Sequence, residues 1–407
     1  MSSAPHATVL YHYFHPDDVV SARHLSDLAT GLAERGWTVT ARPCHRGCRD
    51  ESKTYPMSEK WNGVDIRRVW RPNLKQSSNK GRLLNAAWMI GAWSFTGVFG
   101  QRRQKEVMIV GTDPVLSPLV ALPWRFARTR CRVAHWAFDL YPEAPIAEGM
   151  IRESSLPVRV LKSLLKQAYR RCDLMADLGV CMGDLLAKYG SRGKRVTLVP
   201  WALIEPETPV EPHPTTRSEL FGNAPLGLLY SGNFGRAHSY TEFLELARSL
   251  RADPIRFCFA GRGNRMDELR GAVKPDDANV TFAGFAPESE LERRLGACDL
   301  HLVSLRPEWT GTVVPSKFFG ALATGRGVVF AGSPQSAIAR WIEEYQIGWV
   351  LTPETLPHVT SELRRLAANP QELLALRKRC HAVYQEHFSK QRQLDRWDTE
   401  LRAMIGA

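Results

Sequence analysis

Short apolar runs alternate with longer amphipathic segments along most of the chain. The segments repeat apolar positions every three to four residues, as at 21–35, where Gly36 follows as a helix stop. Strands are expected at 7–11, 38–41, 64–69, 107–111, 133–138, 174–178 and 196–200, and again at 226–230, 256–261, 280–283, 300–305, 327–330 and 348–351. Strand, helix and strand in this order are typical of parallel βαβ units with right-handed crossovers.

The alternation stops at 201–224, where prolines cluster with glutamate and threonine, as in an extended linker. We therefore predict two doubly wound, Rossmann-like α/β domains that face each other across a cleft. Residues 1–200 form the first domain, 201–224 the linker and 225–380 the second domain, and 381–407 form a C-terminal helix that could pack back on the first.

Composition excludes several classes of protein. With 407 residues, 44% hydrophobic and 24% charged, the chain is neither disordered, collagenous nor a polytopic membrane protein. Eight cysteines are too few for a disulfide scaffold, and the N-terminus lacks the pattern of an export signal. A reducing, cytoplasmic location is expected.

Positive charge is concentrated in the first half. Residues 1–200 hold 30 basic and 17 acidic side chains, whereas 201–407 hold 24 and 25. One half is therefore expected to face a polyanion: nucleic acid, an anionic membrane or a phosphorylated substrate. Within 61–105, nine basic residues accompany one acid, and 83–100 is nearly all apolar. A helix of that length reaches about 27 Å, marginal for a membrane span, so we predict an interfacial element; the alternative is a buried core helix with a solvated basic edge.

Ligands of open α/β sheets bind at the carboxyl ends of the strands, so a binding site is expected in the loops that follow them. Gly232, Asn233 and Arg236 follow the strand at 226–230, where a phosphate could approach the backbone, although a Gly-rich turn of this kind is more often purely structural. The second candidate is a helix start at Pro315, where Thr312, Ser316, Lys317 and free amides would form an anion site. An ordinary capped helix is the alternative there.

A resemblance covers almost the whole chain. The ordered set Tyr230-Ser231-Gly232-Asn233, Phe259-Ala260-Gly261-Arg262-Gly263, Val280-Thr281-Phe282-Ala283-Gly284, Pro315-Ser316-Lys317 and Ala323-Thr324-Gly325 resembles the donor-binding domain of retaining GT-B glycosyltransferases of family 4. Asp139-Leu140-Tyr141-Pro142-Glu143 is similar to a stretch of the subgroup that builds bacterial O-antigen and capsule repeat units.

The resemblance implies a retaining hexosyltransferase with a nucleotide-sugar donor, expected to be a UDP-linked N-acetylated hexosamine or related sugar, and a polyprenyl-diphosphate-linked saccharide as acceptor. It implies diphosphate contacts at Gly232, Asn233, Arg236, Ser316 and Lys317, and close approach of nucleobase and ribose at Gly261 and Gly284. The family's E-x7-E glutamates would fall at Thr312 and Gly320, neither of which is acidic.

A catalytic base is expected from the first domain. Asp139 follows the strand at 133–138 and Glu143 lies one helical turn onward, so both are catalytic candidates; capping of a helix is the alternative for Asp139. Ser21, Arg23 and His24 are candidates for the acceptor side, although lone histidines are more often structural. No metal or cofactor is expected, because the sequence has no Asp-x-Asp motif to hold Mg²⁺.

The expected protein is thus a peripheral enzyme of the inner face of the plasma membrane, bound through residues 61–105 to an anionic membrane surface. A nucleotide-sugar epimerase or hydrolase of the same architecture is the first alternative. A nucleic-acid-binding protein is the second, but the aromatic residues near the basic cluster are not interleaved with lysine and arginine, so no nucleic-acid partner is expected.

Overall fold

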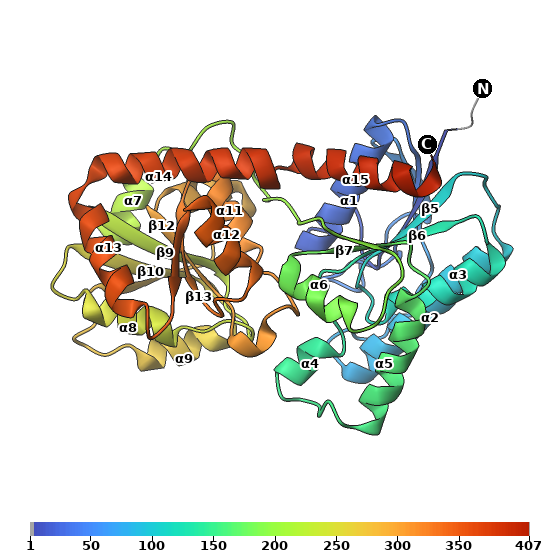
Figure 1. Cartoon of the computed structure of the whole chain (residues 1–407), viewed down its shortest axis with the longest axis horizontal. Coiled ribbons are helices and arrows are strands. Elements are labelled where there is room, and N and C mark those ends of the chain that lie inside the picture. Colours follow the sequence, from blue (N-terminus) through green and yellow to red (C-terminus); the bar gives the residue numbers. More distant parts are fainter. Residues whose placement is uncertain (1–3, 407) are drawn as a thin grey trace. The chain divides into compact units, whose positions relative to one another are not determined.

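The computed structural model describes residues 4–406, which form two compact α/β units (Figure 1). Unit 1 contains the chain up to Val199 and again from Gln393 onward, and unit 2 contains Pro200–Arg392. Each unit is built on one sheet with helices packed on its faces. The predicted α/β class and the two Rossmann-like sheets are confirmed.

The sheet of unit 1 has eight strands in the order β3-β4-β2-β1-β5-β6-β7-β8. They span β1 His6–Leu10, β2 Thr38–Ala41, β3 Ser58–Trp61, β4 Val64–Arg67, β5 Glu106–Val110, β6 Arg132–Trp136, β7 Leu174–Asp177 and β8 Lys194–Thr197. Neighbours are parallel except β3 and β4, which are joined by Asn62 and Gly63 with φ of 44° and 81°. An Asn-Gly pair with positive φ makes the tight turn that suits twisted antiparallel strands.

Helices pack on this sheet as the apolar periodicity requires. They span α1 Val20–Glu34, α2 Asn79–Phe99, α3 Ala121–Ala127, α4 Glu143–Ala147, α5 Leu156–Tyr169 and α6 Val180–Ala187. In α1, Leu25, Leu28 and Leu32 are fully buried. Gly36 ends the helix with φ of 85°, and its N–H donates to the carbonyl oxygen of Ala33, so the predicted helix stop is confirmed.

Unit 2 has a six-stranded parallel sheet in the order β11-β10-β9-β12-β13-β14. Its strands are β9 Leu226–Asn233, β10 Ile255–Arg262, β11 Val280–Ala283, β12 Leu300–Ser304, β13 Gly327–Ala331 and β14 Gly348–Leu351. Its helices are α7 Pro214–Phe221, α8 Thr241–Ser249, α9 Asn264–Ala272, α10 Leu291–Gly296, α11 Lys317–Ala323, α12 Ala337–Tyr345, α13 Leu356–Ala368 and α14 Pro370–Val383.

Three details differ from the sequence prediction. Strand β3 was not expected, because Ser-Glu-Lys-Trp lacks β-branched residues and depends on pairing with β4. The segment 201–224 is not wholly extended: α7 forms within it and buries Leu220 and Phe221. The C-terminal segment that belongs to unit 1 begins at Gln393 and not at 381. The residues between, which include a π-helix at Tyr384–Phe388, belong to unit 2.

The last helix, α15 Lys390–Ile405, completes the core of unit 1 from Gln393 onward. Its Trp397 is fully buried and meets the ring of Trp136 edge to face at 5.1 Å. Gly31 of α1 makes room for Leu394, whose Cδ1 would lie 2.6 Å from a Cβ at that position. Three polar pairs fasten the helix: Arg35 with Asp395, Trp37 with Asp398, and Lys194 with Glu400.

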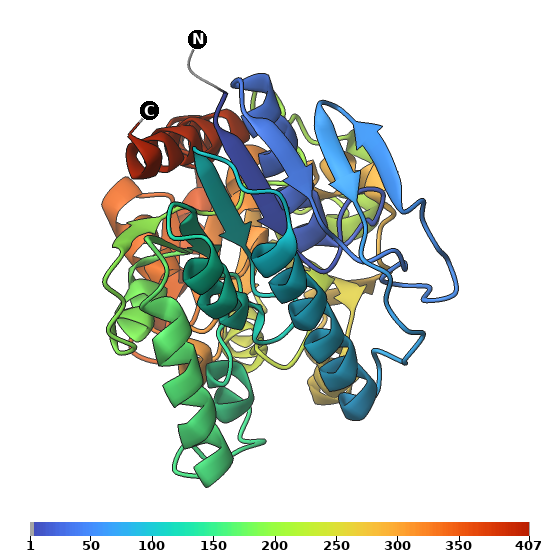
Figure 2. The ribbon, with the colours of Figure 1, turned by 90° about the vertical axis from the view of Figure 1, so that its right-hand side faces the viewer.

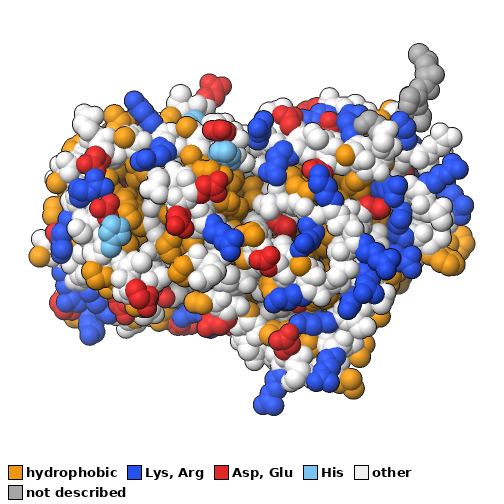
Figure 3. Space-filling model, in the orientation of Figure 1, with side chains coloured by type: hydrophobic (Ala, Val, Ile, Leu, Met, Phe, Trp, Pro, Cys, Tyr) orange, Lys and Arg blue, Asp and Glu red, His pale blue; other side chains and the backbone are white. Residues whose placement is uncertain are grey.

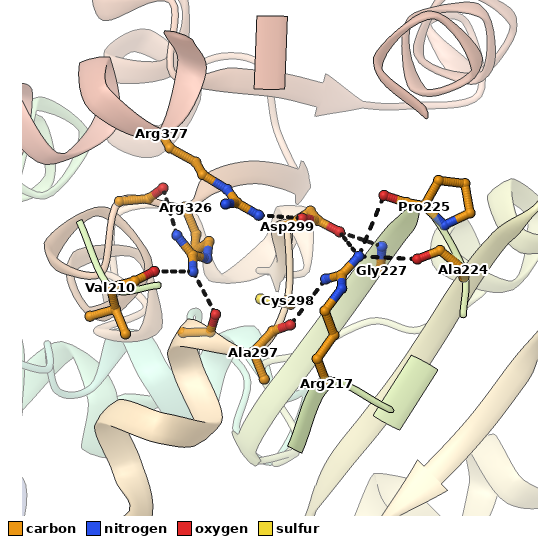
Figure 4. A network of polar contacts seen from close by, with 12 residues as sticks. Val210, Arg217, Ala224, Pro225, Gly227, Ala297, Cys298, Asp299, Arg326 and Arg377 are labelled. Atoms are coloured by element: carbon orange, nitrogen blue, oxygen red, sulfur yellow. Dashed lines mark hydrogen bonds and ion pairs between the residues drawn. The ribbon is translucent and has the colours of Figure 1, made fainter. Parts of the chain in front are cut away.

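Asp299, directly before β12, is a buried anchor of unit 2 (Figure 4). Its carboxylate accepts hydrogen bonds from the Gly227 N–H at 2.8 Å, from Arg217 at 2.8 Å and from Arg377 at 2.6 Å. Arg326 lies beside this cluster and donates instead to backbone carbonyl groups. One carboxylate therefore joins α7, β9 and α14.

Replacing Asp299 by Asn should destabilise unit 2 markedly, because two guanidinium groups lose their buried counter-charge. Removing one partner of a buried ion pair typically costs about 3–5 kcal/mol. Urea unfolding followed by circular dichroism measures the loss. Asp253→Asn is the matched control, since Asp253 pairs with the half-exposed Arg364 and should cost less than about 1 kcal/mol. Equal midpoints for the two variants would contradict the anchoring role of Asp299.

Candidate functional site

Two glycines in register hold the carboxyl ends of β9 and β10 together. Gly232 pairs with Gly261, and a Cβ on Gly261 would lie 2.0 Å from the carbonyl oxygen of Gly232. Gly232 itself has φ of 119°, which other residues rarely adopt. The backbone thus requires both glycines. At Gly261 this packing against β9 accounts for the glycine, and the close approach of a nucleobase there stays a prediction.

Lys317, the first residue of α11, lies beside Gly232. A Cβ on Gly232 would be 3.1 Å from the Cε atom of Lys317. The Nζ atom of Lys317 lies 5.2 Å from the ring centroid of Tyr230 and 3.4 Å from Nε2 of His238. The structure therefore brings together the turn after β9 and the helix start at Pro315, the two segments singled out in the sequence as a phosphate site.

His238 is a neutral neighbour of Lys317, so this edge carries a single positive charge from the pair. Its Nδ1–H donates to the carbonyl oxygen of Ser304 at 2.7 Å, so the lone pair of Nε2 faces the ammonium group of Lys317. Burial, helped by the positive charge of Lys317, lowers the pKa of His238 to about 3, and the ring is neutral. Burial also lowers the pKa of Lys317 to about 8, so Lys317 remains largely a cation at pH 7.

The other residues predicted for this edge differ in their availability. Thr312 is buried and its hydroxyl donates to the carbonyl oxygen of Trp309 at 2.7 Å, so its proton is already used. Ser316 is exposed but makes no capping hydrogen bond, contrary to expectation. Asn233, the last residue of β9, and Arg236, in the turn that follows, are both exposed.

Gly284 faces open space, since a Cβ there would meet nothing within 4 Å. Beside it Phe285 is half exposed, and the guanidinium group of Arg262 lies 4.4 Å from the centroid of its ring. The sequence prediction gave no role to Arg262, the last residue of β10, or to Phe285, which lies two residues after β11. An exposed aromatic ring stacked on a cation is a surface on which a planar group could stack.

Three neighbouring strands of unit 1 also end in polar side chains. His12 follows β1, Asp113 follows β5 and Asp139 follows β6, and these strands are adjacent in the sheet. The Nδ1 atom of His12 lies 3.3 Å from Oδ1 of Asp113. The sequence prediction named Asp139 but not His12 or Asp113, although these two residues follow the strands expected at 7–11 and 107–111, as Asp139 follows the strand at 133–138.

His12 is buried against Tyr13, with ring centroids 4.2 Å apart. Burial disfavours the imidazolium form, but the negative charge of Asp113 and its hydrogen bond outweigh burial and raise the pKa of His12 to about 9. His12 is therefore a cation at neutral pH and not a proton acceptor.

Asp139 lies in a bend between β6 and α4. The capping alternative for it is wrong, because α4 begins at Glu143 with Pro142 in the cap position and no side-chain capping bond. Solvent still reaches the side chain, but desolvation by the surrounding protein and repulsion from Asp113 raise the pKa of Asp139 to about 6. A carboxylate of this pKa can accept a proton near neutral pH.

Glu143 is engaged by its own neighbours. The hydroxyl of Tyr189 donates to its carboxylate at 2.5 Å, and Nζ of Lys162 lies 3.7 Å away. These contacts hold α4 in place, so they account for a glutamate at this position without a reaction. Its catalytic role stays a prediction.

The acceptor-side candidates lie on the first turns of α1. His24 is buried, and its ring stacks on that of Phe138 with centroids 6.2 Å apart. Because Phe138 directly precedes Asp139, this contact brings the start of α1 to the same edge of the sheet. Ser21 interacts with the hydroxyl of Tyr11, and Arg23 is partly exposed.

Helix α2 has one buried and one exposed face, so it combines features of the two alternatives for 83–100, an interfacial element and a buried core helix. Ala86, Met89 and Trp93 face the core. The opposite face exposes large apolar side chains: Leu83, Leu84, Trp88, Phe95 and Phe99. Figure 2 shows α2 and α5 extending from the same side of unit 1, and α3 packs against both. Across residues 4–406, no helix combines the length and apolarity that a membrane crossing needs.

Comparison with known sequences gives two curated bacterial relatives, while no family model matches the chain. The chain is 26% identical over 342 residues to a probable glycosyltransferase, WbjE, of Pseudomonas aeruginosa, covering 81% of this chain and 83% of the relative. It is 23% identical over 315 residues to WcaI of Escherichia coli K12, described as a putative colanic acid biosynthesis glycosyl transferase, covering 74% and 77%.

Solved structures show the same fold at low identity. A sucrose-phosphate synthase from Thermosynechococcus elongatus superposes with a TM-score of 0.71 at 15% identity, covering 99% of this chain and 100% of that one. WaaG, a glycosyltransferase of lipopolysaccharide biosynthesis, gives a TM-score of 0.63 at 16% identity over 99% and 100% of the two chains. Anabaena HepE, solved with UDP and glucose, gives 0.62 at 15% over 98% and 99%. The chain therefore has the GT-B fold, and both curated relatives carry the name of a bacterial glycosyltransferase, one as probable and one as putative.

Proposed function

We propose that the protein is a retaining glycosyltransferase of bacterial surface polysaccharide synthesis. It would move a sugar, such as an N-acetylated hexosamine, from UDP to a saccharide linked to polyprenyl diphosphate. The observation that carries the proposal is the ammonium group of Lys317, held against Gly232 at the carboxyl edge of unit 2. The names of the relatives support the reaction class, and HepE, which was solved with UDP and glucose, supports the donor.

In this proposal unit 2 binds the donor. As the bond to the sugar breaks, negative charge develops on the departing diphosphate, and a fixed cation stabilises that charge more than it stabilises the ground state. Lys317 would supply the charge, because neutral His238 orients its ammonium group without cancelling it. Further hydrogen-bond donors would come from exposed residues close in sequence to this edge: Asn233, Arg236 and Ser316. The ring of Phe285, with Arg262 stacked on it, would flank the nucleobase of the donor.

Unit 1 would bind the acceptor and supply the base. Asp139, with its pKa raised to about 6, would take the proton of the attacking hydroxyl. Asp113, the exposed member of the pair with the buried His12 cation, would accept a hydrogen bond from a sugar hydroxyl of the acceptor at the same edge. Metal independence remains a prediction from the absent Asp-x-Asp motif.

The exposed apolar face of α2 would bring this unit to the membrane. Its neighbours in sequence are the basic flanks at 67–82 and 102–105. Each lysine or arginine near an anionic leaflet adds about 1 kcal/mol of attraction, and apolar side chains add burial in the interface. A polyprenyl-linked acceptor resides at that surface, so peripheral binding would concentrate enzyme and substrate together.

The reaction is tested directly by incubating the protein with a panel of UDP-sugars and polyprenyl-diphosphate saccharides, with and without EDTA. Extended lipid of retained configuration, identified by mass spectrometry and NMR, is the expected product. Lys317→Met should abolish it, and Lys274→Met, an exposed lysine of the same unit, should not. Release of free sugar and UDP without extended lipid, or no turnover with any donor, would overturn the assignment.

Donor affinity should depend on pH through Lys317. Lys317 is charged below its pKa of about 8 and neutral above it, so UDP should bind well at pH 7 and lose affinity as pH rises, by about tenfold per unit above pH 8. Calorimetry between pH 7 and 9.5 measures this change. His238 does not interfere, because it titrates near pH 3. Lys317→Met should bind UDP weakly without this decline; an equal decline in both proteins would exclude Lys317.

Turnover should depend on pH through Asp139. The carboxylate is ionised above its pKa of about 6, so kcat/KM should fall as pH drops below 6. Asp139→Asn should lower kcat by about 10²–10⁴-fold and leave the affinity for UDP unchanged. Asp184→Asn removes an exposed carboxylate of unit 1 and serves as control. If Asp139→Asn retains full turnover, the base must be sought elsewhere.

A further inference from the structure

The positive charge of unit 1 is not confined to the α2 region. Figure 3 shows lysine and arginine side chains gathered over the part of the molecule that carries α2 and α5 in Figure 1. Basic side chains of unit 1 also line a pocket of about 310 Å³. Its charged lining is Arg125, Arg170, Arg171, Asp173, Arg192 and Lys194.

This pocket lies at the edge of the unit 1 sheet opposite to Asp139. Asp173 directly precedes β7, and Lys194 is the first residue of β8, so both mark the amino ends of their strands. Asp139, by contrast, follows the carboxyl end of β6. The pocket is therefore separate from the edge to which the acceptor and the base are assigned above.

The acidic groups at the pocket are already neutralised. Asp173 accepts from Arg132 at 3.0 Å and from the Val133 N–H at 2.9 Å, with Arg125 at 3.9 Å. Outside the lining, Glu400 of α15 binds Lys194 at 2.7 Å. These contacts leave no spare carboxylate for the remaining arginines.

Three arginines consequently keep an uncompensated charge. Within residues 4–406, no ion pair or side-chain hydrogen bond engages the guanidinium groups of Arg170, Arg171 and Arg192. Arg170 and Arg171 follow the last turn of α5, where the helix dipole favours a cation. The helix dipole does not account for Arg192, because this residue lies in the loop before β8. Like charges repel, so an arrangement of three is stabilised when an anion enters.

The walls of the pocket are built to stay in place. A Cβ on Gly193 would lie 2.4 Å from the carbonyl oxygen of Cys172, so the loop before β8 packs directly on the chain before β7. Arg125 is tied to the carbonyl oxygens of Thr129 and Cys131. The side chain of Arg170 lies over Gly190, whose φ is 64°. The charges are thus presented by a fixed backbone frame.

We propose that this pocket binds a phosphate group carried by a small polar compound or by a lipid headgroup. Guanidinium groups match the paired oxygens of a phosphate, and three of them are free to do so. The lining offers no aromatic ring to a nucleobase, so a ligand recognised here is recognised by its anionic group. The site is distinct from the diphosphate site proposed in unit 2 and does not depend on it.

The test uses inorganic pyrophosphate as the probe and the full chain. Arg171→Gln with Arg192→Gln removes two exposed pocket charges, and Arg340→Gln with Arg379→Gln removes two exposed charges from unit 2. Calorimetry should show the affinity of one binding event reduced about tenfold or more in the pocket variant and unchanged in the control. Lys317→Met should retain that event, which separates it from donor binding. Urea midpoints verify that both double variants are folded.

Vesicles then distinguish the two sources of phosphate. If flotation with phosphatidylglycerol vesicles falls in the pocket variant and not in the control, the bound group is a lipid headgroup. If both variants float like the wild type while the pocket variant loses pyrophosphate, the ligand is a soluble phosphate compound. Unchanged pyrophosphate binding in the pocket variant, or an equal loss in both double variants, overturns the proposal.

Discussion

The close approach of β9 and β10 at Gly232 and Gly261 is the constraint on which the candidate donor site depends. A side chain on Gly261 would strike the carbonyl oxygen of Gly232, and one on Gly232 would press on Lys317. With both positions bare, the two strands stay paired up to Asn233 and Arg262. The ammonium group of Lys317 can then lie against Gly232. The neutral ring of His238 faces this ammonium group through Nε2 and adds no charge of its own.

A second constraint acts at the opposite edge of the unit 2 sheet. Asp299 fastens α7, β9 and α14 at the amino side of the unit 2 sheet, while Lys317 lies at the carboxyl side. The buried carboxylate of Asp299 thus holds the helices and strands together at one edge of the sheet. The partly buried ammonium group of Lys317 remains available to a ligand at the other edge. A buried ion pair contributes little net stability, but its removal is costly, so such a pair constrains where the elements lie more than it strengthens the fold.

The sequence predicted the α/β class and nearly all strands, because buried parallel strands are short apolar runs that periodicity detects. It predicted less well where tertiary contacts decide. Strand β3 depends on the Asn62-Gly63 turn, and the His12–Asp113 pair joins residues that are distant in the chain. The sequence alone does not explain the glycine at 261, because a missing side chain leaves room either for a ligand or for a neighbouring strand, and the contact with β9 is a tertiary contact. The charge states of Lys317 and Asp139 likewise follow from burial, which a sequence does not give.

The placement of α15 has a consequence for biosynthesis. Unit 1 buries Trp397 against Trp136, and its first helix leaves a gap at Gly31 that Leu394 fills. The ribosome makes these two partners only after the whole of unit 2. The amino-terminal unit therefore emerges first but is finished last, and an apolar seam on α1 and β6 stays uncovered throughout synthesis of the other unit. A fragment ending at Val199 would keep that seam permanently exposed.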